Sequence, residues 1–174
     1  MSTRELGAAL AAAALAATNA FAAGPDLGKP ITAEEIAAWD ISVSPSGDGL
    51  PPGSGTAAQG AAIFAQKCVG CHGANARGGT NVTLVGGGPI ERLDSVRTIK
   101  NFWPYSTTLF DYIRRAMPWP QPRTLSNDEV YALTAYILAE NKLIGADAVM
   151  NARTLPQVKM PNRDGFIIRF PSEL

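Results

Sequence analysis

The chain of 174 residues has little of the material that most metal and catalytic sites require. It contains two cysteines and one histidine, so it has no disulfide scaffold, and a zinc site would need a carboxylate as its fourth ligand. Its 15 basic residues balance its 15 acidic residues, which argues against nucleic-acid binding because that function needs a basic surface. The sequence also lacks a G-x-S-x-G motif, a phosphate-binding loop and a second histidine that could act as a base.

The N-terminus has the pattern of an export signal. An uninterrupted run of Ala, Leu and Gly at residues 6–17 follows Arg4, and residues 20–22 read Ala-Phe-Ala, a small-x-small cleavage site. We therefore predict a signal peptide at residues 1–22 and a periplasmic location; the alternative is an Ala-rich helix of the mature protein. Elsewhere no apolar run approaches the roughly 18–20 residues of a membrane span, so none is expected after cleavage.

Composition divides the rest of the chain into three zones. Residues 23–55 form an acidic extension that ends in a Pro/Gly-rich linker at 44–55, which we expect to lack regular structure. Residues 56–142 carry the helical periodicity of a core domain, and residues 143–174 form a Pro-containing tail with little periodicity. Helix signals dominate and strand signals are scarce, so the predicted fold class is all-α.

Capping-box pairs mark three predicted helix starts. The pairs are Thr32 with Glu35, Thr56 with Gln59, and Ser126 with Glu129. They predict helices over about 33–39 and 57–68, and a third that Gly145 ends. Ser106 or Thr107 is expected to cap a fourth helix that stops at the Met-Pro-Trp-Pro segment.

The extension and the tail carry apolar residues, but too few to form cores of their own. These residues are Ile31, Ile36, Trp39, Phe166, Ile168 and Phe170. They cover either this domain or the surface of a partner, because exposed apolar patches often mark interfaces. The sequence leaves both alternatives open.

Residues 68–72 read Cys-Val-Gly-Cys-His, the C-x-x-C-H sequence that attaches c-type haem. Two thiols one helical turn apart can reach the two vinyl groups along one edge of a porphyrin, and the next residue then lies under the iron. A thioredoxin-like dithiol would need a βαβ context, and a plain disulfide would leave His72 without a role. We therefore predict one covalent haem c attached through Cys68 and Cys71, with His72 as the proximal iron ligand.

Elimination removes a second His and a third Cys as the sixth iron ligand, and a methionine is then the favoured candidate. His72 is the sole histidine, so a second imidazole from this chain is excluded. Met117 lies where a predicted helix ends, and the fixed backbone of Pro118 can hold the following loop against the haem. Met160, in a Lys-Met-Pro context, is the next candidate, and an open or Lys-ligated iron is the remaining alternative. With both axial positions filled, the expected chemistry is outer-sphere electron transfer.

Three aromatic residues, Trp103, Tyr105 and Trp119, are candidates for the haem pocket. Trp103 and Tyr105 precede the helix that leads to Met117. Buried Trp and Tyr usually find a partner for their N–H or O–H group, and a haem propionate could be that partner. All three residues are therefore predicted to line the pocket or the core.

The chain resembles the class I cytochromes c over residues 57–143. The resemblance implies that a proline carbonyl, here that of Pro89, accepts the N–H of the proximal imidazole. It also implies that Gly60 and Phe64 on the first core helix pack against Tyr136 on the last one. The expected architecture is a class I cytochrome c fold with irregular extensions at both ends.

Longer segments resemble the haem c subunit of periplasmic sulfane dehydrogenase. These segments are residues 34–40, 49–55, 102–105, 109–118, 126–136 and 158–162. The resemblance implies a catalytic partner with a molybdenum cofactor, which oxidises sulfane sulfur and passes the electrons to the haem subunit. Similar haem subunits serve sulfite dehydrogenases. Some family members carry a second haem domain, whereas this chain has one C-x-x-C-H motif, so a separate carrier such as a small cytochrome c is expected downstream.

The sequence thus predicts an electron-transfer subunit of an oxidoreductase complex rather than an enzyme that is catalytic by itself. Two alternatives stay open. The first is a free soluble electron shuttle, which would purify alone. The second is a haem sensor or ligand binder with an open iron, which would bind CO readily in its ferrous state.

Overall fold

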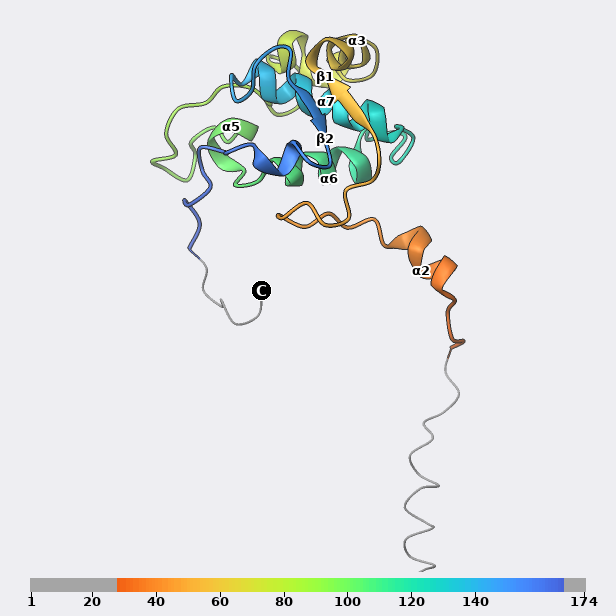
Figure 1. Cartoon of the computed structure of the whole chain (residues 1–174). Coiled ribbons are helices and arrows are strands. Elements are labelled where there is room, and N and C mark those ends of the chain that lie inside the picture. The colour runs from red at the N-terminus through yellow and green to blue at the C-terminus, as the bar shows by residue number, and fades with distance from the viewer. Residues whose placement is uncertain (1–27, 168–174) are drawn as a thin grey trace, which may run out of the picture. The chain divides into compact units, whose positions relative to one another are not determined.

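The computed structural model describes residues 28–167 of the chain (Figure 1). These residues form two compact units, the first being residues 28–41 and the second the remainder. The predicted signal peptide at 1–22 lies outside the described residues, as do the apolar anchors Ile168 and Phe170. Within the described part, no helix combines the length and the apolar character needed to cross a membrane.

The first unit contains one short helix, α2 (Ala33–Trp39), with the predicted bounds. Its N-cap Thr32 accepts a hydrogen bond from the N–H of Glu35 at 3.2 Å, and the Glu35 carboxylate accepts one from the N–H of Thr32 at 2.8 Å. This reciprocal pair satisfies two N–H groups that the start of a helix would otherwise leave unpaired. No residue of α2 is buried.

Three longer helices form the core of the second unit. They are α3 (Ala57–Lys67), α6 (Ser106–Ala116) and α7 (Asn127–Glu140). Figure 1 shows α3 on one side of α7 and α6 on the other. Every residue from 130 to 138 of α7 is buried, so this helix is covered all round and not only along its predicted apolar stripe.

The packing of α3 against α7 depends on a glycine. A Cβ atom on Gly60 would collide with the backbone carbonyl of Ala132 and would lie 2.7 Å from the Cβ of Tyr136. Without a side chain at this position the two backbones can approach closely. One turn later Phe64 stacks on Tyr136, with ring centroids 5.0 Å apart. The contact of Gly60 and Phe64 with Tyr136 that the family resemblance implied is confirmed.

A short antiparallel pair of strands crosses the core helices. Strand β1 (Ser54–Thr56) pairs with β2 (Val149–Asn151), and Gly55 lies opposite Met150. Gly55 also lies against Ala132 of α7, where a Cβ would meet the Ala132 Cα at 2.5 Å. The expectation that the linker lacks regular structure is therefore wrong at its end, because its last residues pair with a segment distant in sequence.

Short helical turns complete the second unit. They are α4 (Val69–His72), η1 (Ala74–Ala76), α5 (Ile99–Phe102) and η2 (Leu155–Gln157). The linker before the core helices and the first part of the tail are both hydrogen-bonded to the core. The Tyr131 hydroxyl donates to the Pro51 carbonyl at 2.9 Å, and the Ser106 hydroxyl donates to the Leu155 carbonyl at 2.6 Å. The linker and the first part of the tail therefore cover this domain itself.

Two predicted helix ends differ in the structure. Ser106 is the first residue of α6 rather than its cap, and the N-cap, Tyr105, makes no side-chain capping bond. The Ser106 hydroxyl is instead engaged by the tail. Helix α7 ends at Glu140 with Asn141 as its C-cap, and Lys142 adopts the left-handed conformation (φ 59°) expected at Gly145. A tight C-terminal turn needs one residue with positive φ, and glycine is its commonest but not its obligatory source.

Candidate functional site

The C-x-x-C-H residues lie on one tight turn where α3 passes into α4. Cys68 is the C-cap of α3, and its carbonyl accepts hydrogen bonds from the N–H groups of Cys71 at 3.1 Å and His72 at 3.0 Å. Cys68 is half-buried against the core, and Cys71 is exposed. The two thiols and the imidazole thus follow one another within a single helical turn, as haem attachment requires.

Two glycines turn the chain back over this motif. Gly73 has φ 74°, and a Cβ atom on it would lie 2.6 Å from the backbone N of Gly79. A Cβ on Gly79 would likewise lie 2.6 Å from the carbonyl carbon of His72. The backbone then returns to the turn, where the N–H of Asn81 donates to the Cys71 carbonyl at 2.9 Å. The motif is therefore held by a loop that larger residues at these two positions would push apart.

The imidazole of His72 is oriented by a main-chain oxygen. Its Nδ1 lies 3.1 Å from the carbonyl oxygen of Val82. A carbonyl can only accept, so this contact places the proton on Nδ1 and leaves the lone pair of Nε2 for a metal. Pro89, the acceptor that the family resemblance implied, is exposed in this structure and lies with Lys100 and Asn162 at a shallow cavity of about 390 Å³.

A buried asparagine holds the loop that carries this acceptor. Asn141, 2% exposed at the end of α7, donates from Nδ2 to the carbonyls of Leu84 at 3.2 Å and Ile137 at 2.9 Å. Its Oδ1 accepts from the N–H of Gly86 at 2.9 Å. All the strong donors and acceptors of the amide are thus used. No motif marks Asn141 as a site residue in the sequence, although an Asn that closes a long apolar helix is itself a capping signal.

The remaining residues predicted for the haem site lie just before or just after α6. Met117 is the C-cap of α6 and half-buried against the core, and its N–H donates to Ile113 at 3.1 Å. Trp103 also packs against the core and meets the Tyr112 ring edge-on, at 5.6 Å between centroids. Tyr105 is less available to a haem, since the guanidinium of Arg163 covers its ring at 4.2 Å from the centroid.

The Cys68 thiol is poorly suited to a zinc site. Burial raises the pKa of the Cys68 thiol to about 11, which disfavours the thiolate that zinc binds. No group of three or more His, Cys, Asp and Glu side chains is placed to hold a metal ion within residues 28–167.

Exposed apolar side chains flank both expected iron ligands. Val82, whose carbonyl meets His72, is 71% exposed, and Trp119, two residues after Met117, is 82% exposed. A flat apolar macrocycle is the kind of group that such side chains can cover. The residues present therefore fit a haem c attached to Cys68 and Cys71.

Comparisons with known proteins agree with this geometry. A family model described as cytochrome C oxidase, cbb3-type, subunit III matches residues 55–137. The chain is also similar to the crystal structure of the sulfane dehydrogenase SoxCD from Paracoccus pantotrophus, with 42% sequence identity and a TM-score of 0.77. That match covers 86% of this chain and 76% of the other. Comparison with curated proteins gave no match. This protein therefore belongs to the class I cytochromes c, in the family of the haem c subunit of sulfane dehydrogenase.

Proposed function

We propose that this protein is a periplasmic monohaem cytochrome c that accepts electrons from a molybdenum-cofactor subunit during sulfane or sulfite oxidation. It passes them to a separate carrier, such as a small cytochrome c. The observation that carries the proposal is the C-x-x-C-H turn with an oriented His72, on a chain 42% identical to sulfane dehydrogenase SoxCD. A bound haem c supplies one-electron exchange.

The residues of this chain serve that function by fixing the iron ligands. The Val82 carbonyl holds the imidazole of His72 in the tautomer that presents Nε2. Asn141 in turn holds the loop around Leu84 and Gly86. Met117, at the end of α6, is the second residue that would hold the iron, and its thioether would favour the ferrous state and close the iron to added ligands. With the iron held by two residues of the chain, such a site would suit electron transfer rather than bond-making chemistry.

Reconstitution with a molybdenum-loaded catalytic subunit of the sulfane dehydrogenase type tests the proposal. We expect the purified holo-cytochrome to co-elute with that subunit at high salt. We also expect its haem spectrum to become that of the ferrous form when the sulfur substrate is added. The same catalytic subunit without molybdenum is the control, and it should leave the haem oxidised.

Two results would overturn the assignment. A cytochrome that always elutes alone and is not reduced by the loaded subunit would indicate a free shuttle. Ready binding of CO by the ferrous protein would indicate an open iron, and hence a sensor or ligand binder.

A further inference from the structure

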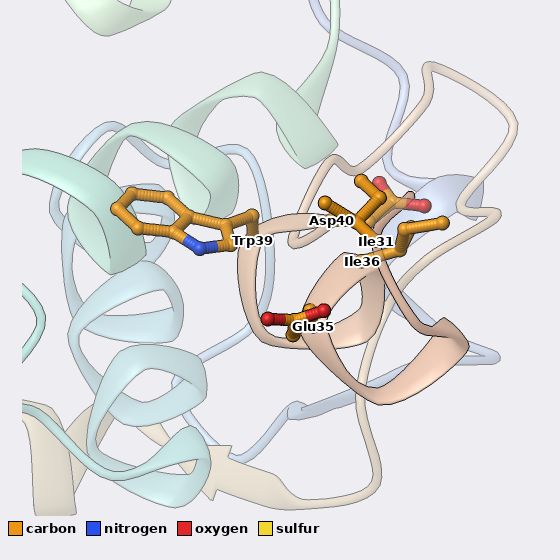
Figure 2. A pocket seen from close by; sticks show the side chains of 5 residues that line it. All are labelled: Ile31, Glu35, Ile36, Trp39 and Asp40. Atoms are coloured by element: carbon orange, nitrogen blue, oxygen red, sulfur yellow. The ribbon is translucent and has the colours of Figure 1, made fainter. Parts of the chain in front are cut away.

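The helix α2 presents an apolar surface that its own unit, residues 28–41, leaves uncovered. Ile31 is 65% exposed, Ile36 is 47% exposed and Trp39 is 79% exposed. Figure 2 shows the Trp39 indole and the side chains of the two isoleucines projecting from this segment. Together with Glu35 and Asp40 these side chains line a hollow of about 530 Å³. Large apolar side chains grouped in this way mark a surface that another molecule covers.

Although α2 has only seven residues, the sequence defines both of its ends by specific hydrogen bonds. Helices of this length are marginal in water because few hydrogen bonds repay the cost of nucleation. The reciprocal bonds between Thr32 and Glu35 define its start, and the N–H of Asp40 donates to the Ile36 carbonyl at 2.8 Å at its end. A defined helix with no buried residue suggests that its apolar side chains are stabilised on a partner.

The charge of this segment indicates what kind of partner surface it fits. Residues 28–41 carry three acidic side chains, Glu34, Glu35 and Asp40, against the single base Lys29. A second copy of the chain would bring the same negative charge to the same surface, and such like-charge contacts are costly. A complementary partner therefore offers an apolar groove with a rim of Lys or Arg side chains.

The chain on the C-terminal side of α2 is firmly attached to the haem domain. The N–H of Val43 donates to the carboxylate of Asp111 at 3.2 Å, and the N–H of Ser54 donates to that of Asp128 at 2.7 Å. Three residues, at 40–42, connect α2 to Val43. A partner that binds α2 is thereby tethered to the domain that carries the haem.

We infer that α2 is a docking helix that fastens this cytochrome to its molybdenum-cofactor subunit, with Trp39 and Ile36 seated in an apolar groove that has a basic rim. This inference rests on the proposed function and adds the surface through which the two subunits associate. An amphipathic helix held in a groove is a recurrent mode of recognition, and tryptophan is enriched among the residues that dominate binding.

Affinity measurements with the holo-cytochrome and the purified molybdenum subunit test the inference. Replacing Trp39→Ala should raise the Kd by about 30-fold, the loss typical of a central tryptophan, and Ile36→Ala should raise it less. Leu93→Ala is the matched control, because Leu93 is apolar and 91% exposed but lies in the other unit; its Kd should change by less than about twofold. The haem spectrum and melting temperature of all variants should match the wild type, since α2 contains no buried residue.

A charge variant tests the basic rim separately. Glu34→Gln combined with Asp40→Asn removes two charges and keeps the capping residue Glu35. It should slow association and weaken the dependence of the association rate on salt. An unchanged salt dependence would contradict a basic rim on the partner.

Three other outcomes would overturn the inference, and they are distinguishable. If the wild type binds the molybdenum subunit and Trp39→Ala binds equally well, the docking role of α2 is wrong while the proposed function stands. If the wild type shows no binding at all, both fail. If sedimentation shows a dimer of the cytochrome that Trp39→Ala dissociates, the occupant is a second copy of this chain.

Discussion

The three methionines among the described residues differ in a way that bears on the iron ligand. Met160 is 3% exposed and Met150 is 4% exposed, so both side chains are enclosed by the core. Met117 is half-buried at the end of α6. The side chain of an iron ligand must face the haem, whereas an enclosed side chain is already covered by its contacts with core residues.

Replacing Met117→Ala should therefore open the iron. We expect the ferrous variant to bind CO and its reduction potential to fall, because the thioether that favours the ferrous state is lost. Spectroscopy under CO and a redox titration measure the two effects. Met160→Ala is the matched control: it should keep the wild-type spectrum and lose about 2–5 kcal/mol of unfolding free energy. The opposite pattern, with CO binding only in Met160→Ala, would transfer the ligand role to Met160.

Side-chain chemistry in the site was predictable from sequence, but its main-chain contacts were not. The C-x-x-C-H spacing names Cys68, Cys71 and His72 directly, because only certain side chains can form those bonds. The acceptor for His72 is a backbone oxygen, which every residue possesses. The choice of Val82 over Pro89 therefore depends on the path of the loop rather than on residue type.

At the scale of elements, an ion pair joins helices α3 and α7, which pack against each other in the core. The Lys67 ammonium at the end of α3 lies 2.6 Å from the Glu129 carboxylate in the first turn of α7. The hydrogen bond from Lys67 lowers the pKa of Glu129 below its ordinary value of 4.5, and the backbone N–H of Ser126 lowers it further. The carboxylate is partly exposed, at 28%, so the pair is worth at most about 1 kcal/mol.

This pair gives the stability of the protein a defined dependence on pH. Since the pKa is lowered in the folded state, the stabilisation is complete above the ordinary value of 4.5 and disappears as the pH falls through the folded-state value. Glu129→Gln keeps an oxygen for the Ser126 N–H but loses the charge. Urea unfolding should show it less stable by about 0.5–1 kcal/mol at about pH 7 and nearly equal to the wild type at about pH 3.

A double-mutant cycle provides the control for that measurement. In the presence of Lys67→Met, the change Glu129→Gln should have little effect at neutral pH, because the partner charge is already absent. A difference between wild type and Glu129→Gln that stays constant from neutral to acid pH would contradict the ion-pair explanation.

Helix starts were predictable because their signals are local. The capping boxes at Thr32, Thr56 and Ser126 all form as expected. A fourth box, between Thr98 and Asn101, opens α5 and was missed, because Asn instead of Glu or Gln occupies its third position. A local capping signal gives a wrong prediction where the hydroxyl has a partner distant in sequence. The Ser106 hydroxyl, for example, donates to the Leu155 carbonyl instead of capping α6.

At the scale of the whole molecule, the strands and the tail escaped prediction because their stability comes from distant residues. Strands of three residues show no alternation that could be recognised, and β1 pairs with a segment near the other end of the chain. The periodicity of residues 143–174 is weak, yet Met150, Leu155 and Met160 are all buried in the core. The first part of the tail is thus structural, which changes what a substitution there should do.

The sharpest test of that role is Leu155, whose side chain is fully buried and whose carbonyl accepts the Ser106 hydroxyl bond. Leu155→Ala should cost about 2–5 kcal/mol of unfolding free energy, because it removes buried methyl groups and leaves a cavity. Val149→Ala is the control: Val149 lies in the same tail and is 45% exposed, so it should cost less than about 1 kcal/mol. Equal, small losses in urea unfolding would mean that the tail is only loosely attached. A large loss at Leu155 alone would mean that the haem domain needs its tail, because residues of the tail complete the core around α6 and α7.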